Sequence, residues 1–187
     1  MDSGRINLQP VLKGSTVALR PLVPADFDAL QRAASDPAIW ALHPDSTRYQ
    51  REVFRERFFD GAISSRGALA VEETATGRII GSSRFYQWRP DTAEISIGYT
   101  FLVRDHWGVG TNAELKHLML SHIYQWADVA WFHVGKENMR SRRAVENLGA
   151  TLSHQQNREL KGKPYVQLYY CLREPQYLAS KRGESQY

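Results

Sequence analysis

The stretch RDHWGVGTNAELKHLML, residues 104–120, comes directly after a run of strand-forming residues and opens a long amphipathic pattern. Gly108 and Gly110 stand one residue apart at the junction, where glycine lets the backbone approach a ligand closely. A helix that begins here would offer unpaired backbone N–H groups to an anion. The stretch therefore predicts a strand, a glycine loop and a helix in that order, with an anion site at the loop.

Apolar periodicity on either side of this stretch predicts seven strands and four helices. Strands are predicted over residues 16–22, 67–73, 78–88, 93–103, 130–134, 150–160 and 164–173. Helices are predicted from Pro24, after Ser46, from the glycine loop and over residues 138–148. Thr47 and Gln50 have capping-box spacing at the second helix. The helix after the loop has one apolar stripe, formed by Leu115, Leu118, Met119, Ile123 and Trp126.

These elements predict an α+β fold with a mixed, mostly antiparallel sheet of about seven strands and helices on both faces. One parallel β-α-β crossover leads from residues 93–103 through the long helix to residues 130–134. We expect one domain across the 187 residues, with a core over about 15–174 and extensions at 1–14 and 175–187.

Charge and composition limit the classes of partner. The formal net charge is +4 and the pI is about 9.3, a mild balance that does not indicate nucleic acid but suits a polyanionic cofactor or an acidic partner. No apolar run approaches the roughly 18 residues of a membrane span, and the first residues lack a signal-peptide pattern. The single cysteine, Cys171, lies among strand formers and is expected to be a buried, inert thiol. We therefore expect a cytoplasmic protein without nucleic-acid or membrane partners.

Residues 108–113 also fit G-x-G-x-x-G/A, the dinucleotide-binding pattern. That fold places the motif in its first β-α-β unit, whereas here the motif follows hairpins in the second half of the chain. The Walker pattern is absent from the sequence, which disfavours a nucleoside triphosphatase. A plain connecting turn is the other interpretation. Gly110 lies in the first turn of a helix, where glycine is unfavourable, and Thr111 and Asn112 add donors for phosphate oxygens, so an anion-binding loop is preferred.

A second motif, NMRSRRAVENLG, spans residues 138–149. Asn138 is predicted to cap the start of its helix, and Gly149 stands where a helix C-terminus is usually capped. Arg140, Arg142 and Arg143 either form a solvated face or place a cation near a phosphate.

Together the two motifs resemble the GNAT superfamily of acetyl-CoA-dependent N-acetyltransferases, in particular the branch of ribosomal-protein-alanine N-acetyltransferases. The resemblance runs from about residue 16 to residue 173 and rests on a Q/R-x-x-G-x-G/A-like loop and an N-x-x-S helix that ends in glycine. It implies a three-layer α/β fold and acetyl-CoA as the acetyl donor, with no metal. The cofactor-binding residues that it implies are Gly108, Val109, Gly110, Thr111, Asn112 and Ala113 in the loop, Asn138 and Ser141 in the helix, and Phe101, Leu102 and Val103 at the strand edge beside the pantetheine arm.

The sequence departs from the family pattern at four positions. Trp107 stands where Gln or Arg is usual, and Asn112 stands where Gly or Ala is usual. Val145 occupies the place of a tyrosine that protonates the leaving thiolate in other members, so that role is unassigned. Ser96 occupies the place of a glutamate that is common in the branch, so the general base must be sought nearby.

Acetyl transfer to a primary amine needs a group that accepts a proton. Glu94 is the first candidate, since it lies two residues before Ser96 on the same face of its strand and could act through a water held by Ser96; an ordinary surface carboxylate is the alternative. His133 is the second candidate, because histidine titrates near neutral pH; a half-buried strand residue is the alternative. Of Tyr169 and Tyr170, which could donate to the thiolate, only one can face the site.

Substrate selection is expected from the connection over residues 36–49, where Trp40 and His43 are candidate pocket walls; Trp40 could equally fill the core. The expected partner is an amine acceptor, either a protein N-terminus or a small molecule, and a homodimer is left open. A coenzyme A-binding sensor without turnover is a second hypothesis, because Val145 and Ser96 depart from the catalytic pattern. A nicotinamide oxidoreductase is a third, which the order of the elements disfavours.

Overall fold

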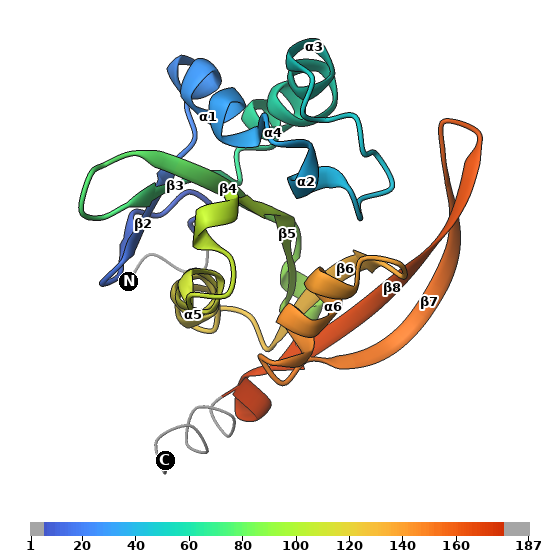
Figure 1. Ribbon diagram of the computed structural model, residues 1–187. Coiled ribbons are helices and arrows are strands. Elements are labelled where there is room, and N and C mark those ends of the chain that lie inside the picture. The colour runs from blue at the N-terminus through green and yellow to red at the C-terminus, as the bar shows by residue number, and fades with distance from the viewer. Residues whose placement is uncertain (1–5, 178–187) are drawn as a thin grey trace.

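The computed structural model describes residues 6–177, which form an eight-stranded sheet with helices on both faces (Figure 1). The strand order is β1-β2-β3-β4-β5-β6-β8-β7. The β5–β6 pair is parallel, and all other neighbouring pairs are antiparallel. The strands are β1 (Leu12–Lys13), β2 (Val17–Pro21), β3 (Ala68–Glu73), β4 (Ile79–Arg89), β5 (Glu94–Leu102), β6 (Val129–Gly135), β7 (Thr151–Leu160) and β8 (Lys163–Arg173). The predicted fold class, with its one parallel crossover, is confirmed.

Short helices between β2 and β3 cover one face of the sheet (Figure 1). They are η1 (Pro24–Asp26), α1 (Phe27–Ala34), α2 (Pro37–Trp40), α3 (Arg51–Phe54), the π-helical segment η2 (Arg55–Phe59) and α4 (Asp60–Ser65). The helices α5 (Thr111–Ile123) and α6 (Met139–Glu146) cover the other face, and η3 (Pro90–Thr92) and η4 (Arg104–His106) lie in connections. Within residues 6–177, no helix is long and apolar enough to cross a membrane.

Each face of the sheet has its own apolar core. Leu115, Met119 and Ile123 of α5 are fully buried against the strands on one face. On the other face, Trp40 packs against Phe101 of β5, and their ring centroids are 5.2 Å apart. Successive residues of a strand point to opposite faces, so β5 contributes to both cores. Each large apolar side chain buried in this way contributes about 1.5–3 kcal/mol, which holds β5 rigidly between the two helical layers.

The predicted strands agree with the observed strands to within one residue at each end. The strand β1 was not predicted because Leu12 and Lys13 are too few to show alternation. The long helix ends at Ile123, so Trp126 lies beyond it although its side chain still packs on the core. The predicted extensions reach residues 1–5 and 178–187, which lie outside the described residues.

Two predictions between β2 and β3 are wrong. The second helix does not follow Ser46 but begins at Arg51, because Gln50 N–H bonds to Thr47 O at 3.1 Å and closes a turn in place of a capping box. Trp40 does not lie in a loop but ends the helix α2. Asp36 starts that helix, since its side chain accepts a hydrogen bond from Ala38 N–H at 2.9 Å.

The sheet opens along one edge of β5. Its parallel pairing with β6 stops at Ser96–Trp131, whereas β6 continues beside β8 as far as Gly135. The register of β5 against β4 also shifts, and Tyr99 has a φ of +52°, as expected of a bulge that bends the strand. Residues 97–102 of β5 therefore have no neighbouring strand on the β6 side, and this divergence creates the space for a site.

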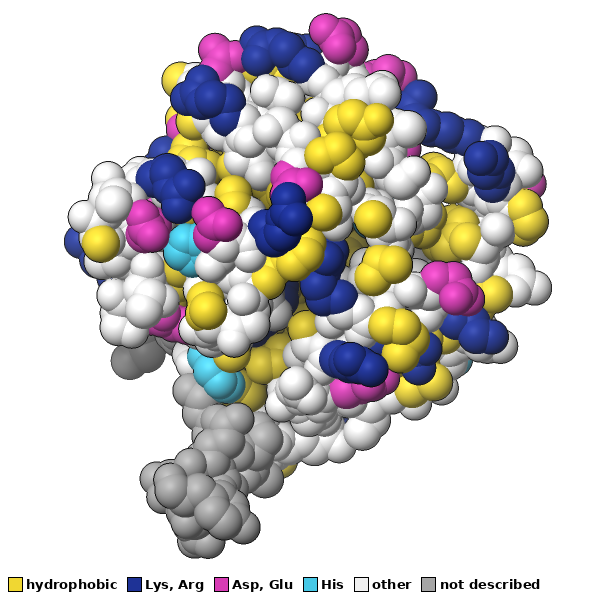
Figure 2. Space-filling view, viewed as in Figure 1, with side chains coloured by type: hydrophobic (Ala, Val, Ile, Leu, Met, Phe, Trp, Pro, Cys, Tyr) yellow, Lys and Arg dark blue, Asp and Glu magenta, His cyan; other side chains and the backbone are white. Residues whose placement is uncertain are grey.

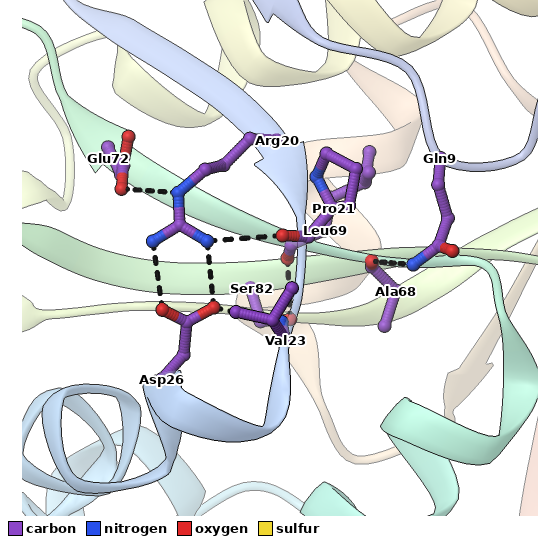
Figure 3. A network of polar contacts seen from close by, with 9 residues as sticks. All are labelled: Gln9, Arg20, Pro21, Val23, Asp26, Ala68, Leu69, Glu72 and Ser82. Carbon is purple, nitrogen blue, oxygen red and sulfur yellow. Dashed lines mark hydrogen bonds and ion pairs between the residues drawn. The ribbon is translucent and has the colours of Figure 1, made fainter.

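A polar network attaches the first helices to the opposite edge of the sheet (Figure 3). The Arg20 guanidinium donates to both oxygens of Asp26 at 2.8 and 2.9 Å and to Glu72 Oε1 at 2.8 Å. Asp26 Oδ2 also accepts from Val23 N–H at 2.9 Å. Burial alone would raise the pKa of Asp26, but the hydrogen bonds from Arg20 and Val23 hold it below its usual value. The start of α1 is thereby fixed against β2 and β3.

Candidate active site

A cavity of about 1660 Å³ lies where β5 and β6 separate. Its walls come from β5, β6, the glycine loop before α5, the helix α6 and the β7–β8 hairpin. Figure 2 shows the surface hollowed between α5 and α6, with Lys and Arg side chains beside the hollow. Pockets for drug-sized ligands are typically roughly 300–1,000 Å³. This cavity therefore has room for a large cofactor together with a second substrate.

The glycine loop presents free backbone donors to the cavity. Gly108 and Gly110 have φ values of +74° and +87°, a region that glycine enters without strain. The first helical bond of α5 runs from Glu114 N–H to Gly110 O at 3.0 Å, and no acceptor within residues 6–177 bonds to the amides of residues 108–113. Unpaired amides at a helix N-terminus are a binding site for phosphate. The loop is therefore suited to the pyrophosphate of a cofactor.

Trp107 anchors this loop and positions a cation. Its indole Nε1 donates to Leu102 O at 2.9 Å, which ties the loop to the end of β5. The Arg140 guanidinium carbon lies 3.9 Å from the centre of the Trp107 ring, and Arg140 Nη2 donates to Ile39 O at 2.8 Å. Trp107, one of the departures from the family pattern, thus holds Arg140 at the cavity wall. Asn112, the other departure in the loop, lines the cavity directly.

The helix α6 forms the opposite wall. Asn138 Oδ1 accepts a hydrogen bond from Ser141 N–H at 3.1 Å, which confirms the predicted N-cap. Gly149 has a φ of +90°, and its N–H bonds to Glu146 O at 2.9 Å, as expected of a residue that ends a helix. Arg143 lines the cavity, whereas Arg142 points elsewhere and donates to Tyr170 Oη at 3.2 Å. Of the three arginines of this helix, Arg140 and Arg143 therefore line the cavity and Arg142 does not.

Most of the predicted site residues converge on the cavity. Those that line it are Trp40, His43, Glu94, Phe101, Leu102, Gly108, Gly110, Asn112, Ala113, His133, Asn138 and Ser141. Ser96, Val103, Val109 and Thr111 do not line it. Val109 is exposed, Val103 packs between the two cores, and Thr111 is buried with its Oγ1 3.2 Å from His106 Nδ1.

Glu94 lies at the end of the cavity far from the glycine loop along β5. Its Oε2 is 2.9 Å from Arg89 Nη2, and both residues line the cavity. Ser96 is fully buried and donates to Gln87 Oε1 at 3.3 Å, so its hydroxyl is already used by a neighbouring side chain. Gln87 lines the cavity where Ser96 was expected. Glu94 is therefore a carboxylate at the end of the cavity away from the glycine loop, where it pairs with Arg89.

Two histidines face the same end. His133 Nδ1 lies 3.0 Å from Tyr86 Oη, and burial, with a smaller effect of Arg158, lowers its pKa to about 4. Burial, with a smaller effect of Arg48, lowers the pKa of His43 to about 4 as well. Both imidazoles are therefore uncharged at neutral pH. A neutral imidazole can accept a proton, so His133 stays a candidate base beside Glu94.

The two adjacent tyrosines of β8 face opposite sides, as predicted. Tyr169 lines the cavity, and its ring stacks on His154 with centroids 4.4 Å apart. Tyr170 is buried on the other side and donates to Glu146 Oε1 at 2.7 Å. Tyr170 is thus a structural residue, and Tyr169 belongs to the site.

Trp40 combines the two roles proposed for it. It is 3% exposed, donates its Nε1–H to Ala34 O at 2.8 Å and packs among the phenylalanines of the core beneath α1–α4. Its edge nevertheless lines the cavity beside His43. The end of α2 and the residues after it therefore line the cavity, and they do so in part through a core residue.

Sequence reasoning missed Lys116, a buried residue of the cavity wall. One signal was present: Lys116 is four residues before Leu120 and seven before Ile123, so it lies on the apolar face of α5. Arg158 and Trp131 were missed as well. Both lie on strands that reach the cavity only through the pairing of β6, β8 and β7, which no local pattern reveals.

Comparison with known proteins agrees with this architecture. Residues 16–151 match the acetyltransferase (GNAT) domain family. No curated protein matches the chain. Among solved structures, a GCN5-related N-acetyltransferase from Brucella melitensis superposes with a TM-score of 0.82 at 21% identity, covering 93% of this chain and 83% of that one. RimJ of Mycobacterium smegmatis, in complex with CoA-disulfide, has a TM-score of 0.70 at 16% identity, covering 92% and 94%.

A third structure, the ribosomal L7/L12 alpha-N-protein acetyltransferase RimL in complex with coenzyme A, has a TM-score of 0.71 at 16% identity and covers 88% of this chain and 98% of that one. At these identities the superpositions establish a shared fold. Family membership rests on the domain match, which spans most of the chain.

Proposed function

Because this chain belongs to the acetyltransferase (GNAT) domain family, we propose that it transfers an acetyl group from acetyl-CoA to a primary amine. The fold of the family supports acetyl transfer from acetyl-CoA. The amine acceptor is our inference, and it includes both a protein N-terminus and a small molecule.

One observation carries the proposal: the amides of residues 108–113 have no acceptor within the described chain, and they border a cavity that leads to Glu94. Phosphate oxygens would satisfy these donors. The unpaired edge of β5 between the two ends could hydrogen-bond the amides of a pantetheine arm, as an edge strand binds an extended peptide. The thioester would then lie toward Glu94 and His133.

In this arrangement different residues would bind the donor, accept the proton and bind the acceptor. The glycine loop, with Asn138 and Ser141 of α6, would bind and orient the donor. Glu94 would accept the proton that the amine loses as its nitrogen attacks the thioester carbonyl. Arg89 keeps the carboxylate in place. Trp40 and His43 would bound the space for the acceptor.

Incubation with acetyl-CoA and a panel of amines and peptide N-termini tests the proposal. We expect acetyl-CoA to raise the melting temperature, since a ligand at 100 times its Kd stabilises the folded state by about 2.7 kcal/mol. We also expect at least one acceptor to accelerate thiol release and to gain one acetyl group by mass spectrometry.

The same experiment separates the enzyme from its alternative. Stabilisation by acetyl-CoA without turnover on any acceptor would favour a coenzyme A-binding sensor, an alternative that gains support from Val145, a buried residue of the cavity wall that has no hydroxyl to donate. No stabilisation and no turnover would count against both functions.

A further inference from the structure

The acceptor end of the cavity has an excess of positive charge. Among the described residues that line the cavity, Glu94 is the single carboxylate, and Arg89 already pairs with it. Arg48 and Arg158 line the same end. The nearby carboxylate of Asp45, which is buried, lies within 4 Å of Arg48, Arg57 and Lys161 and cannot neutralise all three.

A hydrogen-bond donor also lacks an acceptor at this end. The buried Nε1–H of Trp131, a cavity-lining residue, has no hydrogen-bond partner among the described residues. A buried donor without an acceptor costs about 1–3 kcal/mol, so such groups in a binding cavity call for a ligand that supplies acceptors.

Arg158 is preorganised to meet such a ligand. It projects from β7, and its Nε and Nη2 donate to Tyr169 Oη at 3.3 and 2.7 Å. Within residues 6–177, no carboxylate pairs with its guanidinium. An arginine held by a neutral hydroxyl keeps its charge and further N–H groups available for an anion.

We propose that the acceptor is a primary amine that also carries an anionic group, a carboxylate or a phosphate, which Arg158 and the donors beside it bind. This inference rests on the proposed function and names the substrate class for the same site. A polycationic acceptor is disfavoured, because Arg48, Arg89 and Arg158 would repel it.

Pairs of acceptors that differ only in an anionic group test whether the site prefers a negative charge. The first pair is an amino acid and its α-amide; the second is a pair of peptides that begin with Asp or Asn; spermidine is the cationic member. All acceptors are assayed at one pH near neutrality, and each rate is divided by the fraction of the reacting amine that is neutral at that pH. We expect kcat/KM to be about 10–100-fold higher for the anionic member of at least one pair, the range that a charge-assisted hydrogen bond supplies. The first pair reports a small molecule, and the second reports a protein N-terminus.

The variant Arg158→Gln should reduce this preference to within about threefold and leave the KM for acetyl-CoA unchanged. Arg158 is exposed, so the variant is expected to fold; Arg32→Gln, an exposed arginine on α1, is the matched control and should behave as wild type. Equal rates for charged and neutral acceptors, a preference for spermidine, or a preference that survives Arg158→Gln would overturn this inference while leaving acetyl transfer intact. Acetylation of no acceptor would instead refute the proposed function.

An independent observation concerns Lys116 of α5. Its side chain is 4% exposed, and Nζ donates to Thr100 Oγ1 at 2.6 Å and to Ser83 Oγ at 3.4 Å. No carboxylate within residues 6–177 pairs with it. A buried ammonium without an anion is unfavourable, and an apolar residue would fill the same space without that cost. Burial alone lowers the pKa of Lys116 to about 7.

The position of Lys116 relates it to the leaving group. It lies six residues after Gly110, roughly 9 Å along the helix axis, and it contacts Thr100 in the part of β5 that has no neighbouring strand. A donor bound at the glycine loop and extended along this edge passes Lys116 on its way to Glu94. Lys116 therefore lies beside the path of the donor, between the glycine loop and Glu94.

We propose that the Lys116 ammonium protonates the coenzyme A thiolate as it leaves. This role also rests on the proposed function. The amine nitrogen bonds to the carbonyl carbon and loses a proton to Glu94. The carbon–sulfur bond then breaks, its electron pair goes to sulfur, and a proton passes from Nζ to sulfur to give the free thiol. The proton held by Glu94 returns to Lys116 through solvent, so both groups recover their starting state.

Other groups in the cavity are less suited to this step. His43 and His133 are uncharged at neutral pH and have no proton to spare in that form. Burial raises the pKa of Tyr86, which makes it a poorer acid. A thiol has a pKa of about 8.5, so transfer from Lys116 is downhill. The polar groups that face Nζ are hydroxyls from β4 and β5, and no charged group contributes to the shift of its pKa.

Two variants of Lys116 separate proton transfer from charge. Lys116→Met should lower kcat about 10²–10⁴-fold, the usual contribution of a general acid, with the KM for acetyl-CoA within twofold. The decline of the wild-type rate above pH 7, where the acid loses its proton, should disappear in this variant. Lys116→Arg keeps a charge but cannot release a proton near neutral pH, so it should be similarly slow. Lys136→Met, at an exposed lysine outside the cavity, is the control.

The melting temperature and acetyl-CoA binding of each variant report folding. Lys116→Met should be at least as stable as wild type, because it removes a buried ammonium. An undiminished rate in Lys116→Met would overturn the role of Lys116 alone, and a rate restored by Lys116→Arg would show that charge rather than proton transfer matters. Absence of turnover in the wild-type chain would instead refute acetyl transfer itself.

Discussion

Replacing Gly110 with tryptophan is expected to abolish acetyl-CoA binding, with a Kd at least about 100-fold weaker. The amides of residues 108–113 are unpaired, and each charge-assisted hydrogen bond to a phosphate contributes about 1.5–3 kcal/mol. An indole at residue 110 would occupy the space in front of these amides. Loss of two such bonds is enough for the expected change.

The protein itself should tolerate Gly110→Trp. A Cβ built at Gly110 meets no atom within 4 Å, so the new side chain enters open space without displacing the chain. The φ of +87° costs a non-glycine residue about 1–2 kcal/mol, which the melting temperature will register as a modest decrease. Binding should therefore be lost from a folded protein.

Gly77 offers a matched control. It lies between β3 and β4, has a φ of +71°, and a Cβ there also meets nothing within 4 Å. Gly77→Trp should show the same small decrease in melting temperature and bind acetyl-CoA as wild type does, by isothermal titration calorimetry. Wild-type affinity in Gly110→Trp would remove the glycine loop from the cofactor site.

The variant Glu94→Gln is expected to lower kcat about 10²–10⁴-fold at neutral pH, because a general base contributes in that range. The KM for acetyl-CoA should change little, since Glu94 lies away from the glycine loop. Glutamine keeps an oxygen that can accept from Arg89 Nη2, which lies 2.9 Å from the carboxylate, so the local geometry is preserved while the base is lost.

The pH dependence gives this test its sign. An α-amino group has a pKa of about 8, so the rate of the wild type should rise as the amine becomes neutral toward that pH. Because a neutral amine still loses a proton to Glu94 as its nitrogen attacks the carbonyl, the deficit of Glu94→Gln should persist as the pH rises past 8. A pH–rate profile that matches wild type would exclude Glu94 as the base. A comparable loss in His133→Gln, with its imidazole neutral above a pKa of about 4, would transfer the role to His133.

The sequence-based predictions were most accurate where the structure depends on interactions between residues close together in the chain. Strand bounds agreed to within one residue because alternation between two faces is a property of neighbouring residues. The N-cap at Asn138 was correct because it needs an acceptor side chain beside an amide three residues on. The second helix was misplaced because Thr47 and Gln50 have the spacing of a capping box but close a turn instead.

The contacts of the site residues could not be predicted in the same way, because they join residues that are far apart in the sequence. Sequence alone could not decide which arginines of α6 face the cavity. Arg140 and Arg143 do so, and the Trp107 ring lies under the Arg140 guanidinium. Nor could the sequence show that Ser96 bonds to Gln87, since a register shift between β4 and β5 brings them together. Lys116 passed unnoticed because its burial requires Thr100 and Ser83, which precede it by 16 and 33 residues.

The sequence by itself determined the order and type of the main elements, the glycine loop and the capped helix, because backbone preferences and caps act over a few residues. It also determined the family, since both motifs lie in one continuous matched region. Only the tertiary structure decided where β5 leaves β6, and with it which side chains line the cavity that results. That separation accompanies a register shift between β4 and β5 and a bend at Tyr99, and strand register is a property of contacts between residues far apart in the chain.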